Sequence, residues 1–242
     1  MTALHTLGVA DIVTRVRQRD VSPVEIVEAC YKRVEALEPR LKAWVTLDRD
    51  GAMAVAQQHE QRLRRGEDIG ALGGVPVGLK DIFYTAGMRT TAGSRVYADF
   101  IPDYDATSVV RLKEAGAVVL GKAVTTEFAT SDPSPTRNPW DIAHTPGGSS
   151  SGSAVAVAAR MIPAALGSQT GGSTLRPAAY NGIVGLKATY GRISRYGVIP
   201  VSWCLDHVGI LVRRVEDAAI VLQAIAGYDP HDPGALAEPP GN

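Results

Sequence analysis

Three short segments of the sequence carry the residue types that cleavage of an amide bond requires. They are residues 74–81, which contain a lysine, and residues 146–153 and 167–173, in which serines are embedded among glycines. Amide hydrolysis needs a nucleophile, a base that takes its proton, and hydrogen-bond donors for the oxyanion that develops on the carbonyl oxygen. A lysine and two serine clusters can supply the first two of these parts.

Ser173 is our candidate nucleophile. It follows Gly171 and Gly172, where the absence of side chains lets several backbone N–H groups converge on one point. We expect residues 174–180 to begin a helix, whose N-terminus adds a partial positive charge at that point. The backbone amides of Thr170, Gly171, Gly172 and Ser173 are therefore the candidate oxyanion donors.

Lys80 is the candidate base. It ends an apolar run, residues 75–79, that is typical of a buried strand. Burial disfavours the charged ammonium, and bringing the pKa of a lysine from about 10.4 to about 7–8 would leave an amine that accepts a proton. The alternative is a purely structural pair between Lys80 and Asp81 at the strand end.

Together, the three segments resemble the amidase signature family, whose members hydrolyse amide bonds with a serine, a second serine in a cis peptide, and a lysine. The resemblance extends from about Ser22 to about Asp229. It implies that Ser149, cis to Gly148, relays the proton between Lys80 and Ser173. With this resemblance we expect Ser150 and Arg176 to bind substrate, and we expect no metal and no cofactor.

The sequence departs from the family pattern in two ways. Ser151 stands where a glycine is usual, which requires that this position needs neither a positive φ nor a close backbone approach. Family members are also typically much longer, so the chain resembles the N-terminal part of an amidase. We expect residues 1–228 to form the catalytic region and the Pro- and Gly-rich residues 229–242 to form a loose tail.

Two other motifs match known sites only in part. Residues 116–122 match the start of a phosphate-binding loop, but Ala123 stands where a magnesium-binding hydroxyl is required, and the interior is strand-like. Residues 148–152 match a nucleophile elbow centred on Ser150, for which His207 beside Asp206 is the candidate base. A nucleophile elbow requires a strand directly before the serine, and no strand pattern precedes Ser150.

The elements that position these residues follow from periodicity and capping. Ser22 and Glu25 form a capping box with a proline between them, which predicts a helix over residues 22–37. Apolar periodicity predicts further helices and strands. The helices are 51–65, 107–115, 153–160 and 215–226, and the strands 75–79, 117–120, 164–167 and 183–186. This alternation predicts an α/β fold with a mixed, mostly parallel-type sheet and helices on both faces, incomplete at the C-terminus.

Composition restricts the environment and the partners. Basic and acidic residues balance at 25 each, so no net field favours nucleic acid or an anionic membrane. Cys30 and Cys204 are too few for a disulfide framework, and no apolar run approaches a membrane span of about 18 residues. We expect a cytoplasmic protein with no direct nucleic-acid contact.

The expected function is hydrolysis of a linear carboxamide, with Arg176 pairing with a carboxylate on a small substrate. One alternative is a component that resembles the amidotransferase subunit which feeds ammonia to misacylated glutamyl- or aspartyl-tRNA. Such subunits more often carry aspartate at the position of Gln169. Another alternative is a catalytically silent binding module. A homodimer or a partner chain is the expected means of completing the pocket.

Overall fold

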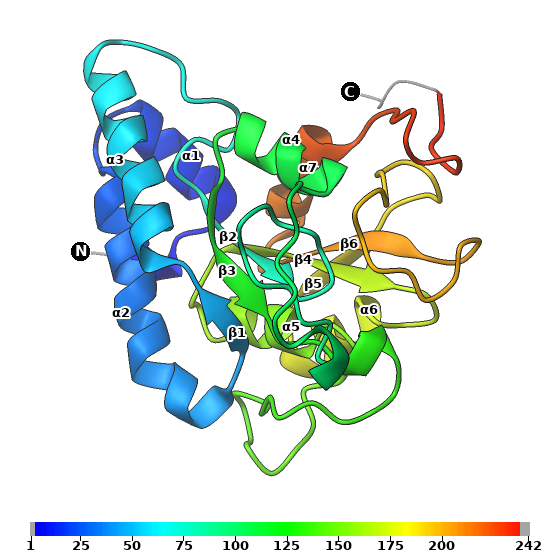
Figure 1. Ribbon diagram of the computed structural model, residues 1–242. Coiled ribbons are helices and arrows are strands. Elements are labelled where there is room, and N and C mark those ends of the chain that lie inside the picture. Colours follow the sequence, from blue (N-terminus) through cyan, green and yellow to red (C-terminus); the bar gives the residue numbers. More distant parts are fainter. Residues whose placement is uncertain (1–2, 238–242) are drawn as a thin grey trace.

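The computed structural model describes residues 3–237, which form an α/β structure around one six-stranded sheet (Figure 1). The strands are β1 (Trp44–Leu47), β2 (Pro76–Lys80), β3 (Val118–Ala123), β4 (Ala164–Gln169), β5 (Val184–Lys187) and β6 (His207–Val212). The α-helices are α1 (Val9–Arg17), α2 (Pro23–Leu41), α3 (Arg49–Arg64), α4 (Thr107–Glu114), α5 (Ser151–Ala158), α6 (Leu175–Asn181) and α7 (Val215–Ile225).

The sheet is mixed, with strand order β1-β3-β2-β4-β6-β5. The three central strands are parallel because α4 connects β2 to β3 and α5 connects β3 to β4, each returning the chain to the same edge. The parallel part is smaller than expected. β5 and β6 are joined without an α-helix and pair antiparallel, and β6 and β1 are antiparallel to β4 and β3.

Helices cover both faces of the sheet, as the sequence predicts. One apolar core packs α1, α4 and α7 against the sheet, and Val77, Leu79 and Leu166 point into it. The opposite core contains residues of α2, α3, α5 and α6, and Val118, Leu120 and Ala165 point into it. Figure 1 shows α4 and α7 on one side of the sheet and α5 and α6 on the other. Successive strand residues thus serve opposite cores.

The predicted elements are present, with small differences at their ends. The capping box at the start of α2 is formed, since Ser22 N donates to Glu25 at 2.9 Å and Val24 N donates to the Ser22 hydroxyl at 3.0 Å. α5 begins two residues earlier than expected, at Ser151, and β4 continues to Gln169. Both extensions bring an element directly into a serine-containing segment.

Among the α-helices and strands of residues 3–237, three were not predicted: α1, β1 and β6. The absence of β6 from the prediction matters most, because β6 lies between β4 and β5 and pairs with β4 from Ala164↔Val212 to Gln169↔His207. Val208, Ile210 and Leu211 are apolar strand residues buried on the two faces. The neighbouring polar residues and the long irregular connection before them concealed this pattern.

The prediction of a loose tail from Asp229 is wrong for its first residues. Asp229 is buried, and its carboxylate accepts hydrogen bonds from the hydroxyls of Thr107 and Ser194 at 2.5 Å. Asp232 is also buried and binds Arg195 through both carboxylate oxygens. These polar contacts hold the segment to the body of the protein. The end of the expected tail, residues 238–242, lies outside the described residues.

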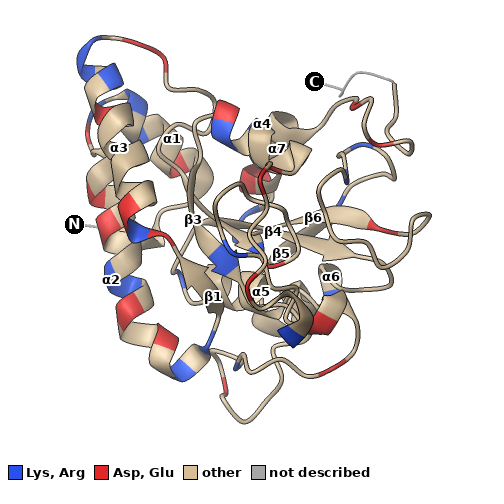
Figure 2. Ribbon diagram, viewed as in Figure 1, with Lys and Arg blue, Asp and Glu red and all other residues tan. Residues whose placement is uncertain are grey.

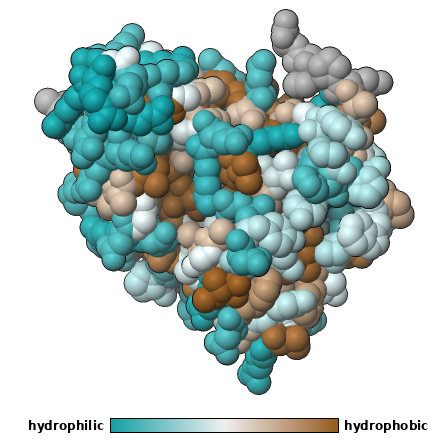
Figure 3. Space-filling model, turned by 45° about the horizontal axis from the view of Figure 1, so that its top comes forward, coloured by the Kyte–Doolittle hydropathy of each residue, from teal (hydrophilic) through white to brown (hydrophobic). Residues whose placement is uncertain are grey.

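Charged residues gather mainly on the helices and loops (Figure 2). Figure 3 shows hydrophilic residues covering the end of the molecule at which α3 terminates, and smaller hydrophobic patches elsewhere. Within residues 3–237, no helix is long and apolar enough to cross a membrane. Two lysines differ from these exposed charged residues, because Lys80 on β2 and Lys122 on β3 are completely buried.

Candidate active site

Lys80 lies at the end of β2 and is completely buried. Its Nζ is 2.7 Å from the hydroxyl oxygen of Ser149 and 2.8 Å from that of Ser168. The central strands place it there, because β2 pairs with β4 in parallel and Leu79 is in register with Leu166. The next residues of both strands therefore extend together, and their polar side chains meet at the same edge of the sheet.

The electrostatic environment of Lys80 favours a neutral amine. Burial lowers the pKa of Lys80 to about 7, and the negative charge of Asp206 opposes this effect. Both hydrogen-bond partners, Ser149 and Ser168, are uncharged hydroxyls that can donate as well as accept. A substantial fraction of the protein therefore carries, near neutral pH, an amine that can accept a proton.

The segment that carries Ser149 turns sharply into α5. The Gly148–Ser149 peptide bond is cis. Ser149 is buried, and its carbonyl oxygen accepts a hydrogen bond from Thr126 N at 3.3 Å. Ser151 is the first residue of α5 and its φ is not positive, so the serine is tolerated where a glycine is usual. Its hydroxyl lies 2.8 Å from that of Ser134.

Ser150 does not have the surroundings expected of a substrate contact. Its side chain is completely buried, donates to the carbonyl oxygen of Ser168 and accepts from Ser168 N, both at 3.2 Å. The hydroxyl thus joins the start of α5 to β4. The nucleophile-elbow interpretation is also excluded, because His207 contacts the Leu205 carbonyl and the Tyr190 ring instead of Ser150.

Ser173 lies in the loop between β4 and α6, at 7% exposure. The side chain of Gln169 closes this loop, since its Oε1 accepts hydrogen bonds from Thr174 N at 3.0 Å and Leu175 N at 2.9 Å. The Ser173 carbonyl oxygen accepts from Ser150 N at 3.2 Å, which brings the two serine segments together.

The amides of residues 170–173 have no acceptor within the described part of the chain. These N–H groups are therefore available to a ligand. The structure brings Lys80 and Ser149 into hydrogen-bond contact, whereas residues 3–237 contain no hydrogen bond between the hydroxyls of Ser149 and Ser173. Of the two expected hydrogen bonds, the one between Lys80 and Ser149 is therefore present in the described residues, and the one between Ser149 and Ser173 is not.

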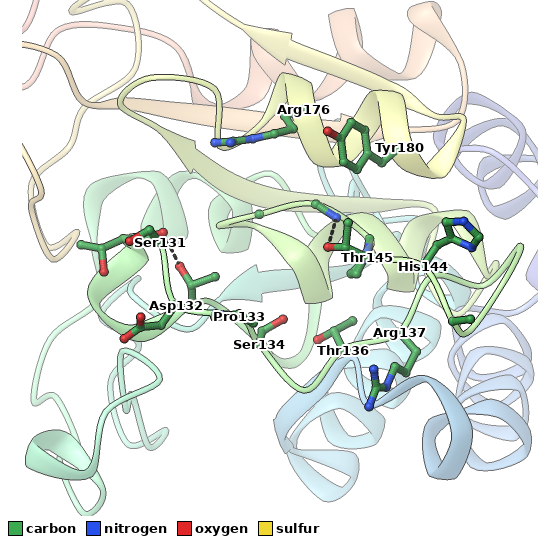
Figure 4. Close-up of a pocket in the computed structure, with 16 residues that line it drawn as sticks. Ser131, Asp132, Pro133, Ser134, Thr136, Arg137, His144, Thr145, Arg176 and Tyr180 are labelled. Atoms are coloured by element: carbon green, nitrogen blue, oxygen red, sulfur yellow. Dashed lines mark hydrogen bonds between the residues drawn. The ribbon is translucent and has the colours of Figure 1, made fainter.

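A polar cavity of about 530 Å³ adjoins the cis peptide. Figure 4 shows Arg176 and Tyr180 of α6 along one side of this cavity, and residues 131–134 with Thr136 and Arg137 along the other. Gly147 and Gly148 also line it, whereas the side chains of Ser149 and Ser173 do not. A Cβ placed on Gly172 would lie 3.6 Å from the Arg176 guanidinium, so this arginine lies beside the loop that carries Ser173.

A second buried lysine, Lys122 of β3, was not recognised from the sequence. Its Nζ donates to the carbonyl of Phe83 and to the hydroxyl of Thr90, the latter at 2.8 Å, and lies 4.0 Å from Asp81. Burial lowers its pKa, and Asp81 opposes this effect. Asp81 thus faces Lys122 and not Lys80, which excludes the structural pair between adjacent residues. The segment that resembled a phosphate-binding loop is the strand β3.

Sequence reasoning also missed Ser168 and Asp206. Ser168 belongs to the third serine-containing segment, and alternation along β4 would have placed it on the same face as Leu166. Asp206 carried no sequence signal of its own beyond its position beside His207, because its partners come from distant loops.

Comparisons with known proteins identify the family and related structures of this chain. The sequence profile of the family described as Amidase matches residues 25–241. A protein of Carboxydothermus hydrogenoformans, named as one subunit of glutamyl-tRNA(Gln) amidotransferase, is 48% identical over 95% of this chain and 48% of that protein. Native peptide amidase from Stenotrophomonas maltophilia has a TM-score of 0.89 and 41% identity, over 97% of this chain and 50% of that one.

A solved structure of a vestigial protein complex, described as revealing the origins of an s-triazine catabolic enzyme, has a TM-score of 0.92 and 37% identity. It is matched over 96% of this chain and 52% of that one. The chain spans about half the length of the curated relatives it matches.

Proposed function

The chain belongs to the amidase signature family, and on that premise we propose that its site hydrolyses a linear carboxamide through an acyl-enzyme. The observation that carries the proposal is the buried amine of Lys80, which is hydrogen-bonded to the hydroxyl of Ser149. An uncharged lysine amine next to a hydroxyl is a base in contact with a proton relay. No histidine base is needed for this arrangement.

In the proposed reaction, the Ser173 oxygen forms a bond to the carbonyl carbon of the amide. The hydroxyl proton of Ser173 passes to the Ser149 oxygen, and Ser149 gives its own proton to Lys80. The lysine ammonium then returns a proton by the same route to the departing nitrogen as the C–N bond breaks. Water hydrolyses the resulting ester by the same proton transfers, which regenerates Ser173. The step requires contact between Ser149 and Ser173 when substrate is bound.

The loop of residues 170–173 supports stabilisation of the oxyanion. We assign the role of donors to the amides of Thr170, Gly171, Gly172 and Ser173, because they have no acceptor within residues 3–237. Gly171 faces open space, since nothing lies within 4 Å of a Cβ built on it. A substrate can therefore approach the loop at Gly171. Removing one such donor from an enzyme typically costs a factor of about 10²–10³ in kcat.

We further propose that the substrate is a small amide that carries a carboxylate. Arg176 and Arg137 both line the polar cavity next to the cis peptide (Figure 4). A guanidinium can bind a carboxylate through two parallel hydrogen bonds. The lining contains these two arginines and one acidic residue, Asp132, and Arg176 lies beside the loop that carries Ser173. Such a cavity fits a substrate with a carboxylate better than it fits an apolar amide.

A second candidate function is that of a glutaminase component in a tRNA-dependent amidotransferase. The supporting observation is the 48% identity to a protein named as part of glutamyl-tRNA(Gln) amidotransferase. Glutamine is itself a carboxylate-bearing carboxamide, so the same site chemistry serves both candidates. Glutamine hydrolysis that increases only when partner proteins and acylated tRNA are added would favour the amidotransferase function. Turnover of several small amides without partners would favour a stand-alone amidase.

Fluorophosphonate labelling tests the proposed nucleophile directly. We expect the probe to modify Ser173, as detected by peptide mass spectrometry, and Ser173→Ala to abolish the modification. Ser131→Ala is the matched control, because Ser131 lines the same cavity but lies outside the hydrogen-bonded site. A folded protein whose Ser173 is not modified would contradict the proposal and favour a catalytically silent binding module.

A further inference from the structure

Asp206 lies outside the three serine- and lysine-containing segments, and its carboxylate connects two loops next to the site. It directly precedes β6, and its Oδ1 accepts a hydrogen bond from the hydroxyl of Thr170. Its Oδ2 accepts from the backbone amides of Val201 at 2.7 Å and Ser202 at 2.9 Å. A single carboxylate thus joins the loop after β4 to the loop before β6.

The position of Thr170 gives this contact its importance. Thr170 begins the loop that carries Ser173 and the candidate oxyanion amides. At the other end of that loop, the side chain of Gln169 accepts from Thr174 N and Leu175 N. The Thr170 hydroxyl is therefore the side-chain anchor at the first residue, and Asp206 is the group that holds it. Because Gln169 and His207 are the last pair between β4 and β6, Thr170 and Asp206 lie just beyond the paired strands.

The loop on the far side of Asp206 is itself fixed to the protein. The carbonyl oxygen of Trp203 accepts hydrogen bonds from Tyr190, at 2.8 Å, and from Arg195. Arg195 in turn pairs with the buried Asp232. Asp206 therefore holds Thr170 from an anchored segment, which is what a group that positions another residue requires.

Asp206 also provides the negative charge that acts on Lys80. The other groups around Lys80 are neutral or are directed elsewhere. Ser149 and Ser168 are neutral hydroxyls, and the carboxylate of Asp81 accepts from Thr91 and faces the buried Lys122. His207 contacts the Leu205 carbonyl and the Tyr190 ring. Of the described acidic residues, Asp206 is the one whose charge acts on this amine.

We propose that Asp206 is a positioning residue of the site: it holds the Thr170 hydroxyl from an anchored loop, so that the amides of residues 170–173 point toward the reacting carbonyl. The effect of its charge on Lys80 is a second, supporting consequence. The catalytic consequence rests on the proposed amide hydrolysis. The two structural consequences do not, because loop order and lysine protonation exist without a substrate.

Two substitutions separate the two consequences. Asp206→Asn keeps the shape of the side chain but removes its charge, so we expect Lys80 to titrate at lower pH and the loop to loosen. Thr170→Val removes the hydroxyl and keeps the charge, so we expect a looser loop and an unchanged titration of Lys80. Each variant should lower kcat for a small amide by about tenfold, less than the loss of a whole oxyanion donor. Asp20→Asn is the control for net charge, because Asp20 is exposed and far from these contacts in sequence.

The deciding measurements do not require turnover. The protonation of Lys80 is followed by NMR of isotope-labelled lysine side chains, with the signal assigned through Lys80→Met. Loop order is followed by hydrogen exchange of the amides of residues 170–173. Faster exchange in both variants, together with a lower midpoint for Lys80 in Asp206→Asn only, supports the proposal.

An unchanged midpoint and unchanged exchange in folded Asp206→Asn would overturn the proposal. If Asp206→Asn does not fold, Thr170→Val decides the loop contact: unchanged exchange of the amides of residues 170–173 in folded Thr170→Val would overturn the positioning role. If the parent has no amidase activity but the variants show the lower midpoint of Lys80 and the faster amide exchange, the proposed function is rejected and the positioning role is retained. If the parent has amidase activity but neither the midpoint of Lys80 nor the exchange of the amides of residues 170–173 changes in the variants, the positioning role is rejected and the proposed function is retained.

Discussion

The amine of Lys80 and the hydroxyl of Ser149 lie 2.7 Å apart although the two residues are 69 positions apart in the chain. Both groups are buried, and the contact forms where the end of β2 meets the turn that leads into α5. A proton can pass in either direction between a hydroxyl and an amine whose pKa is lowered. Such a contact can therefore serve proton transfer, which a purely structural hydrogen bond does not.

The first prediction concerns the pH dependence of amide hydrolysis. Lys80 must be neutral to take a proton, and burial lowers its pKa to about 7. The value of kcat/KM is therefore expected to fall as the pH decreases below about 7 and to reach a plateau above about 8. Lys80→Ala should lower kcat by more than about 10³-fold, since the base is lost. A pH profile of kcat/KM checks this, with Lys32→Ala, an exposed lysine, as the control.

The second prediction concerns stability. The pKa of Lys80 is lower in the folded protein than in the unfolded chain, so the unfolded state binds more protons between about pH 7 and 10. Stability should therefore rise with pH from about 7 to 8.5, by up to about 1.4 kcal/mol per pH unit for this one proton.

Lys80→Met removes the titrating amine and keeps a side chain of similar volume. The variant should be more stable than the parent at pH 7, and its stability should depend less on pH. Urea unfolding at pH 6.5, 7.5 and 8.5 measures both effects. Part of the slope should remain in this variant, because burial also lowers the pKa of Lys122. Equal slopes in parent and variant would show that Lys80 is charged in the folded protein.

The third prediction concerns Ser168, the second hydroxyl on the lysine amine at 2.8 Å. Ser168→Ala should leave Lys80 bound to Ser149 alone and free to reorient, and we expect a fall in kcat of about tenfold, corresponding to about 1.4 kcal/mol. The value of KM should change little, because Ser168 does not line the polar cavity. Steady-state kinetics measure this split. Ser168→Thr, which keeps a hydroxyl, should restore much of kcat.

The fourth prediction concerns the substrate carboxylate. Arg176→Ala should raise KM about 10- to 100-fold for an amide that carries a carboxylate, because a charge-assisted hydrogen bond contributes about 1.5–3 kcal/mol. The same amide as a methyl ester should be affected little by the substitution. Arg137→Ala is the comparison, since Arg137 lines the cavity from the opposite side. A carboxylate preference that survives both substitutions would contradict the proposed substrate class.

The fifth prediction concerns the C-terminal segment. Burial alone would raise the pKa of Asp229, but hydrogen bonds from Ser194, Thr107 and His231 together lower it to about 2. A carboxylate whose pKa is lowered stabilises the fold above about pH 4, and this contribution is lost as the pH falls toward 2. Asp229→Asn should therefore destabilise the protein at pH 7 and make acid unfolding less steep. Thermal melts at pH 3, 5 and 7 check this, with Asp20→Asn as the control.

The local elements were predictable because each has its own signal in neighbouring residues. The capping box at Ser22 and Glu25 specifies the start of α2 whatever the rest of the chain does. The apolar runs of β2, β3 and β4 are buried on both faces, as central parallel strands are, and read as strands. β6 escaped prediction because polar residues and a long irregular connection precede its apolar residues.

The chemical types of Lys80, Ser149 and Ser173 were visible in the sequence, since glycine-embedded serines and a lysine at a strand end are local patterns. The sequence by itself determined which groups were available and which local segments would be helix or strand. The tertiary structure decided that Ser150 binds backbone, that Asp81 faces Lys122, and that Asp206 reaches Thr170. These contacts join residues of different strands and loops, and the direction in which a side chain points depends on packing that no local pattern specifies.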